Sequence, residues 1–260
     1  MKKYNFTLIE LLIIVAIIAV QAVILLPVLD NARDNAKASQ CANNLRQLGV
    51  AIEAYCADNN SKIVVKKDSG EAKGLWKYSV SWSGLIVANK YTRSLPSFLC
   101  PATNASPNDI ILKQPQTTRQ QDFNRTSVAS GLRPMWANQS YGMNCSFYGS
   151  ANAWLKAKNQ GTPFACPSKT QSMTVLSLDK ITDAAAFPLL SDSGSSEFNN
   201  RYVYGISRVP ETEKHSRINL RHEDTNPVSF ADGSVQMFSQ QDWKNIGADA
   251  VYIGKNLIRF

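Results

Sequence analysis

Three polar residues in the last third of the chain have side chains that could serve catalysis or bind a metal ion. Asp192, His222 and Asp232 supply two carboxylates and an imidazole, the groups used by hydrolases and metal centres. Both carboxylates also suit ordinary turns, Ser-Asp-Ser-Gly around Asp192 and Asp-Gly at Asp232. No nucleophile elbow, phosphate-binding loop or dinucleotide fingerprint accompanies them. We therefore expect a protein that is not an enzyme.

The same region offers weak signals for a bound metal ion. The sequence has no C-x-x-C pair and no histidine cluster at metal-ligand spacing, which argues against zinc. Oxygen atoms of Asp192, Ser193 and Asn199 are of the kind that calcium prefers. We expect no cofactor, with calcium at these three residues as the weaker alternative.

The five cysteines form an odd set, so at least one of them has no partner within the chain. Cys100 and Cys166 share the context Phe-x-Cys-Pro, which suggests equivalent positions in two segments and makes them the first choice for a disulfide. Cys41 and Cys56 cannot pair with each other in one helix, because fifteen residues separate them by about 22 Å.

The beginning of the chain is the segment that must position the rest. Residues 6–29 are almost wholly apolar and long enough for a helix to cross a bilayer, which takes roughly 20 residues. Lys2 and Lys3 precede this span, so we expect the N-terminus in the cytoplasm and the remainder outside. Glu10 interrupts the apolar span. Thr7-x-x-Glu10 is a capping box, and a carboxylate in a membrane segment can equally serve assembly, so both roles stay open.

A helical period continues beyond the apolar span. Apolar residues recur at spacings of four and three, at Cys41, Leu45, Leu48, Ile52 and Tyr55. This pattern predicts one helix from Phe6 to Ala57. Its first part, 6–29, would lie in the membrane or a filament core, and its amphipathic continuation, 30–57, would pack on a globular domain formed by 58–260.

The globular domain is predicted to be rich in strands toward its C-terminus. Short strand candidates are Lys62–Lys66, Phe187–Ser191, Tyr202–Ile206, Arg217–Leu220, Val228–Ala231 and Ser234–Phe238. Asp232-Gly233 between the last two predicts a type I′ hairpin in which Phe230 faces Val235 and Val228 faces Met237. Residues 82–89 suggest a short helix, and 101–134 a surface excursion. The expected fold class is α+β, a long helix packed on an antiparallel sheet.

The N-terminal sequence Phe6-Thr-Leu-Ile-Glu-Leu-Leu12 after a short basic leader resembles type IV pilins and type II secretion pseudopilins. The resemblance implies a pilin-like fold. It also implies that a prepilin peptidase removes residues 1–5 by cutting between Asn5 and Phe6, and that the new amine of Phe6 is methylated. Glu10 would then meet the terminal amine of a neighbouring subunit, and Pro27 would loosen the helix. The family usually has glycine before the cut, whereas this chain has Asn5.

A second resemblance concerns the C-terminal part. His222, Asp232 and Gly233 form a His-x9-Asp-Gly segment similar to one in a large bacterial family with pilin-type N-termini. The resemblance does not establish what this segment does.

Together these patterns predict a structural subunit of a type IV pilus-like or type II secretion filament. Its expected location is the inner membrane, with a single pass and an extracytoplasmic domain, before it joins the filament. The expected partners are the prepilin peptidase, other pilin or pseudopilin subunits and the inner membrane. The net charge of +8 is scattered without a dense basic run, so nucleic acid is not an expected partner. The alternative is a monomeric membrane-anchored module that binds glycan or DNA.

Overall fold

The computed structural model describes the N-terminal helix and the core of an α+β domain. The described residues are 7–67, 80–92, 94–103, 140–144, 164–165, 173–194, 205–206, 217–248, 250–253 and 256–260. Several residues of the sequence predictions lie outside them: the leader 1–5 with Asn5, Phe6, Cys166, Asn199 and nearly all of 101–134.

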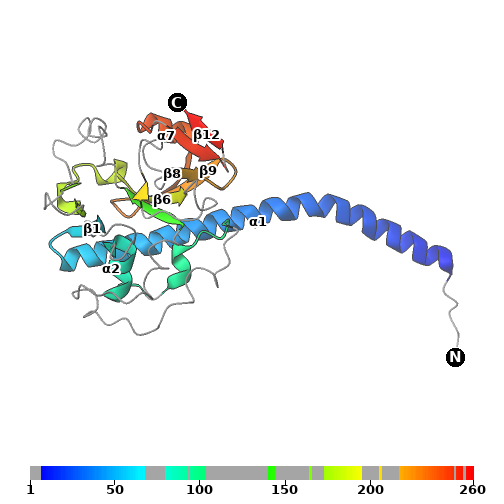
Figure 1. The fold of residues 1–260 in the computed structure, drawn as a ribbon. Helices are drawn as coiled ribbons and strands as arrows, with labels where there is room; N and C mark the ends of the chain where they lie inside the picture. Colours follow the sequence, from blue (N-terminus) through cyan, green and yellow to red (C-terminus); the bar gives the residue numbers. More distant parts are fainter. Residues whose placement is uncertain are drawn as a thin grey trace, which may run out of the picture.

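One helix, α1 (Leu8–Asp58), contains 51 residues and runs from beyond the domain to its far end (Figure 1). It begins with the predicted capping box: the Thr7 hydroxyl accepts a hydrogen bond from the Glu10 amide, and the Glu10 carboxylate accepts one from the Thr7 amide at 2.9 Å. The helix stays α-helical through Pro27, so the loosening expected there does not interrupt it. Over the described residues, the prediction of one continuous helix is confirmed.

The two ends of α1 have different surroundings. All five positions of the predicted apolar stripe are buried: Cys41, Leu45, Leu48, Ile52 and Tyr55. By contrast, every leucine, isoleucine and valine from Leu8 to Leu29 is between 47% and 81% exposed. The first end projects away from the domain (Figure 1), and it is long and apolar enough to cross a membrane.

The larger sheet has the strand order β10-β9-β6-β8-β11-β12, and β3 pairs with both β6 and β7. Its strands are β3 (Tyr141–Asn144), β6 (Pro188–Gly194), β7 (Gly205–Ile206), β8 (Arg217–Leu220), β9 (Thr225–Phe230), β10 (Val235–Ser239), β11 (Ala250–Ile253) and β12 (Asn256–Arg259). The pairs β8–β11 and β3–β7 are parallel, and the other pairs of this sheet are antiparallel. The predicted antiparallel character is thus largely confirmed.

The larger sheet separates two hydrophobic cores. One core joins the second half of α1 to Tyr141, Met143 and Leu190. The other joins Val228 and Phe230 of β9 to Trp243 of α7 (Gln240–Asn245). Successive residues of a strand point to opposite faces. Accordingly, Ser229 faces α1. A Cβ atom added at Gly49 of α1 would lie 3.2 Å from Ser229 Oγ.

A smaller sheet with the order β2-β1-β5-β4 packs near the end of α1. It consists of β1 (Lys62–Lys67), β2 (Val80–Ser81), β4 (Phe164–Ala165) and β5 (Met173–Ser177). The short helix α2 (Trp82–Ala88) follows β2, and 3-10 turns occupy η1 (Leu95–Phe98), η3 (Leu178–Lys180) and η4 (Ala184–Ala186). The strand predicted at Lys62 and the helix predicted at Trp82 are both present.

The hairpin at Asp232-Gly233 exists, but its predicted turn type and register are wrong. Gly233 has φ +82°, whereas Asp232 is not among the positive-φ residues, so the turn is not type I′. The Gly233 amide donates to the Phe230 carbonyl, and the Phe230 amide donates to the Ser234 carbonyl. The loop therefore holds three residues with glycine at the bulge. Val235 consequently pairs with Ser229, and Met237 with Pro227.

The turn expected at Ser191–Gly194 is also wrong. These residues continue β6, and all seven residues of the strand are buried. Ser and Asp are common in turns, but here a strand on each side completes the backbone pairing of β6. The carboxylate of Asp192 is thereby carried into the interior.

Candidate functional site

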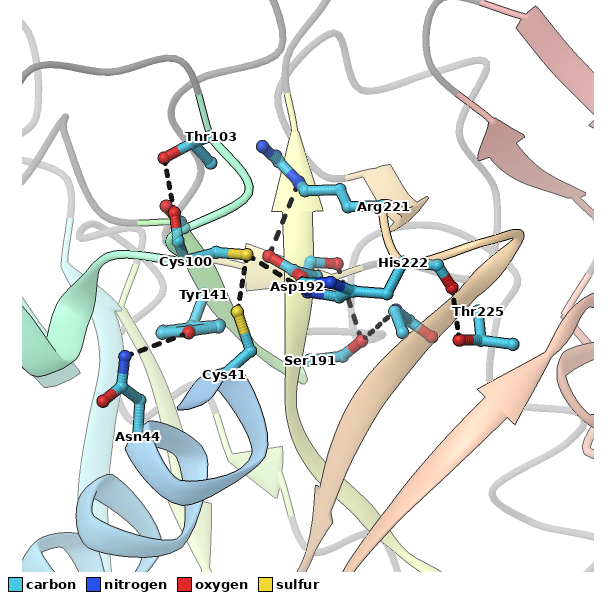
Figure 2. Close-up of polar contacts among 12 residues, drawn as sticks. Cys41, Asn44, Cys100, Thr103, Tyr141, Ser191, Asp192, Arg221, His222 and Thr225 are labelled. Atoms are coloured by element: carbon cyan, nitrogen blue, oxygen red, sulfur yellow. Dashed lines mark hydrogen bonds and ion pairs between the residues drawn. The ribbon is translucent and has the colours of Figure 1, made fainter. Parts of the chain in front are cut away.

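Four side chains that can ligate metals or undergo redox chemistry meet inside the domain. Cys41 comes from α1, Cys100 from the segment after η1, Asp192 from β6 and His222 from the turn between β8 and β9 (Figure 2). One ligand atom from each residue lies within 4.8 Å of every other, and all four residues are buried. The members are far apart in sequence, so only the folded chain reveals them as a group.

A hydrogen bond from Asn44 joins the two cysteine segments, and two further bonds fix the segment of Cys100. Asn44, one turn after Cys41, donates its side-chain amide to the Leu99 carbonyl at 3.0 Å. The Ser140 amide donates to the Phe98 carbonyl at 2.9 Å, and the Thr103 hydroxyl to the Cys100 carbonyl at 2.7 Å. The two sulfur atoms of Cys41 and Cys100 end 2.6 Å apart.

His222 is placed by a tight hairpin turn. Its amide and carbonyl both bond to Thr225 at 2.9 Å, and the two residues between them, Glu223 and Asp224, have φ of +47° and +60°. Positive φ at both central residues is the mark of a type I′ turn. The turn type predicted at Asp232-Gly233 thus occurs at the other end of β9.

This turn explains the spacing of the His-x9-Asp-Gly segment. Between His222 and Asp232 lie two turn residues, the six residues of β9 and Ala231. The strand runs along α1, because Ser229 faces Gly49 and the Cβ position of Gly233 would lie 3.1 Å from Glu53 Oε1. His222 meets Cys41 at one end of this contact, and Gly233 meets Glu53 at the other. The segment therefore lies against the second half of α1 at both ends of β9.

The charge on Asp192 is balanced by two basic residues. Its carboxylate oxygens lie 3.6 Å from His222 Nε2 and 3.5 Å from Arg221 Nε. Within the described part of the chain neither oxygen accepts a hydrogen bond, so Asp192 depends on these ion pairs. Arg221 is itself fixed, since its guanidinium donates to the Ser193 carbonyl.

Burial and the neighbouring carboxylate shift the pKa values in the cluster. Burial alone would lower the pKa of His222, but its contacts with Asp192 and Cys100 outweigh burial and raise it to about 9. Burial, followed by the contact with Cys41, raises the pKa of the Cys100 thiol well above its ordinary value. As a free thiol Cys100 would therefore stay protonated, which makes it a poor nucleophile.

The sequence predictions located part of this cluster. His222 and Asp192 do come together, but Asp232 lies exposed at the opposite end of β9. Ser193 points away from Asp192 and donates its hydroxyl to the Ser140 carbonyl at 3.2 Å. Asn199, the third suggested calcium ligand, lies outside the described residues, so the calcium set stays a prediction. Sulfur and nitrogen neighbours also suit calcium poorly.

The predicted pair of Cys100 with Cys166 stays a prediction, because Cys166 lies outside the described residues. Among the described residues, Cys100 contacts Cys41. The sequence places Cys41 on the apolar stripe of α1 and excludes its pairing with Cys56 within that helix. The sequence signals for this pair were weak: Cys41 lies on the apolar face of a helix, and Cys100 precedes a proline.

No protein-family model, curated protein or solved structure matches this chain. The resemblances noted in the sequence therefore remain expectations.

Proposed function

We propose that this protein is a structural subunit of a type IV pilus-like or type II secretion filament, anchored and assembled through α1. The observation that carries the proposal is the first part of α1, whose apolar side chains from Leu8 to Leu29 are exposed on every side of the helix. A helix that packed on one soluble partner would need only an apolar stripe. Apolar residues all round call for a bilayer or several neighbouring helices.

The length of this segment suits both insertion in the membrane and later packing against other subunits. Twenty-two residues at 1.5 Å each give about 33 Å, close to the roughly 30 Å of a bilayer core. The second half of α1 is committed to the domain, so the first half alone is available for a membrane or for other subunits. Cleavage between Asn5 and Phe6 by the prepilin peptidase would leave this assembly segment at the mature N-terminus.

One observation favours the alternative, a monomeric membrane-anchored binding module. The capping box with Thr7 gives Glu10 a local role that needs no neighbouring subunit. The two functions differ in what they require of Glu10. A filament requires its negative charge as the partner of the Phe6 amine, whereas a lone anchor requires only a capping acceptor.

The charge and the cap can be separated by two substitutions. Glu10→Gln keeps a side chain that can cap at this position but removes the charge, and Glu10→Val removes both. In a filament a buried amine would lose its counter-charge in either variant. We expect both variants to be inserted and cleaved, with methylated Phe6 detected by mass spectrometry, yet neither to be recovered in sheared or cross-linked multimers.

The control is the wild-type chain processed in parallel. Multimers formed by Glu10→Gln as well as by the wild type would mean that Glu10 acts only as a helix cap. A wild-type chain recovered only as a monomer would favour the monomeric module. An intact Met1 in membranes that contain the peptidase would remove the filament proposal altogether.

A further inference from the structure

We propose that Cys41 and Cys100 form a disulfide that joins α1 to the domain. The inference goes beyond assembly and rests on the proposed function only for its extracytoplasmic location, where disulfides persist. It replaces the Cys100–Cys166 pair expected from sequence.

The backbone geometry that brings the sulfur atoms together does not depend on them. Asn44 bonds to the Leu99 carbonyl beside Cys100, and both Asn44 and Leu99 are buried. The Ser140 amide holds the neighbouring Phe98 carbonyl from β3's side. The two cysteines therefore face each other because the helix and the loop are already fixed one residue or one turn away.

The two sulfur atoms are close enough for a bond between them. Nonbonded heavy atoms rest at roughly 3.5–4.0 Å. Two cysteines on one tetrahedral zinc ion, at about 2.3 Å each, have sulfurs about 3.7 Å apart. A disulfide bond measures about 2.05 Å. The Sγ atoms of Cys41 and Cys100 lie 2.6 Å apart, so a small shift of the two side chains brings them to the length of a disulfide bond.

The remaining members of the cluster need no metal ion to balance their charges. Asp192 already faces His222 and Arg221, at 3.6 Å and 3.5 Å. Once the sulfurs are bonded to each other, neither can carry a negative charge. His222 Nε2 lies 3.3 Å from Cys100 Sγ, so the imidazole packs against the bond while it pairs with Asp192.

The bond forms by exchange with a protein disulfide donor of the extracytoplasmic compartment. A thiolate of one cysteine attacks the donor's disulfide and gives a mixed disulfide, which the second cysteine then resolves. Two S–H bonds are lost, one S–S bond forms, and the donor leaves with both electrons as a dithiol. Since both cysteines are buried in the folded domain, this exchange precedes or accompanies the docking of α1.

The bond closes a loop between positions 59 residues apart and fixes α1 where its free and packed parts meet. A loop of this length is long enough for a substantial stabilisation. We expect loss of the disulfide bond to lower the melting temperature of the domain by about 10 °C.

The direct test uses the full-length protein extracted from membranes of an expressing cell in the presence of an alkylating agent. Nonreducing digestion and mass spectrometry should yield a linked peptide that contains Cys41 and Cys100. Metal analysis of the same sample should find less than one zinc ion per ten chains. Alkylated Cys41 and Cys100, with or without bound zinc, would overturn the inference, and so would a Cys100–Cys166 peptide.

Variants add a second readout. Cys41→Ala with Cys100→Ala should lower the melting temperature by the stated amount, and Cys56→Ala is the matched control. Cys56 is buried on the same helix, and burial raises the pKa of its thiol to about 12. A smaller loss in the double variant than in the control would contradict the bond. Protease added to spheroplasts, in which the outer face of the inner membrane is accessible, tests the location separately. A digested domain with free thiols would overturn the disulfide alone, and a protected domain would also overturn the extracytoplasmic location.

Discussion

The two halves of α1 differ in their content of apolar residues and in how those residues are arranged. From Leu8 to Leu29 the apolar residues surround the helix and are exposed. From Cys41 to Cys56 they form a stripe that the larger sheet and η1 cover. The difference teaches that a one-sided stripe of apolar residues marks the part of the helix that the chain buries by itself. Residues apolar on all sides must be covered by something outside this chain.

The covered half should carry much of the stability of the domain. Leu48→Ala removes a fully buried side chain and should cost about 2–5 kcal/mol of unfolding free energy. Leu12→Ala, the matched change in the exposed half, should leave domain unfolding unchanged. Denaturant unfolding of the full-length proteins, followed by tryptophan fluorescence to which the buried Trp82 and Trp243 contribute, measures both. Equal losses of unfolding free energy in Leu48→Ala and Leu12→Ala would contradict the difference between the two halves of α1.

A smaller loss is expected where the hairpin after β9 touches the covered half. Gly233→Val places a β-branched residue at φ +82° and puts a Cβ 3.1 Å from Glu53 Oε1. We expect a cost of about 1–3 kcal/mol. Gly233→Asn is the control, because asparagine tolerates positive φ and the Glu53 side chain can move aside. Thermal melts that show the same loss for both variants would mean that contact with α1, rather than the backbone conformation, requires the glycine.

The smallest expected effect concerns the Ser229 hydroxyl between α1 and β9. Here the substitution should stabilise the domain rather than destabilise it. Ser229 Oγ is buried and has no hydrogen-bond partner among the described residues. Ser229→Ala should therefore stabilise the domain by about 1 kcal/mol, since it removes an unsatisfied polar group. Ser191→Ala is the contrasting control, because Ser191 Oγ accepts from Asn226 at 2.7 Å. A destabilised Ser229→Ala would indicate that the hydroxyl is satisfied by a buried water.

Much of the fold could be predicted from the sequence because periodicity is local. The long helix, its buried stripe, the capping box and most strands of the last third follow from spacing and composition. The hairpin after β9 was located correctly but assigned the wrong turn, because Asp-Gly fits both a type I′ turn and a type I turn with a bulge. Glu223-Asp224, which does adopt the type I′ conformation, carries no glycine to mark it.

The sequence by itself determined that this chain has one long helix, apolar all round at its start and striped thereafter, followed by an α+β domain. It also supplied the His-x9-Asp-Gly spacing. Only the tertiary structure decided what that spacing does: β9 spans the contact with α1, and His222 reaches Cys41 and Cys100. The same holds for Asp192. The local sequence predicts a turn there, whereas the pairing of β6 with its neighbouring strands puts Asp192 in a buried strand. The cluster has four members from four segments, and proximity between distant segments depends on packing rather than on any local pattern.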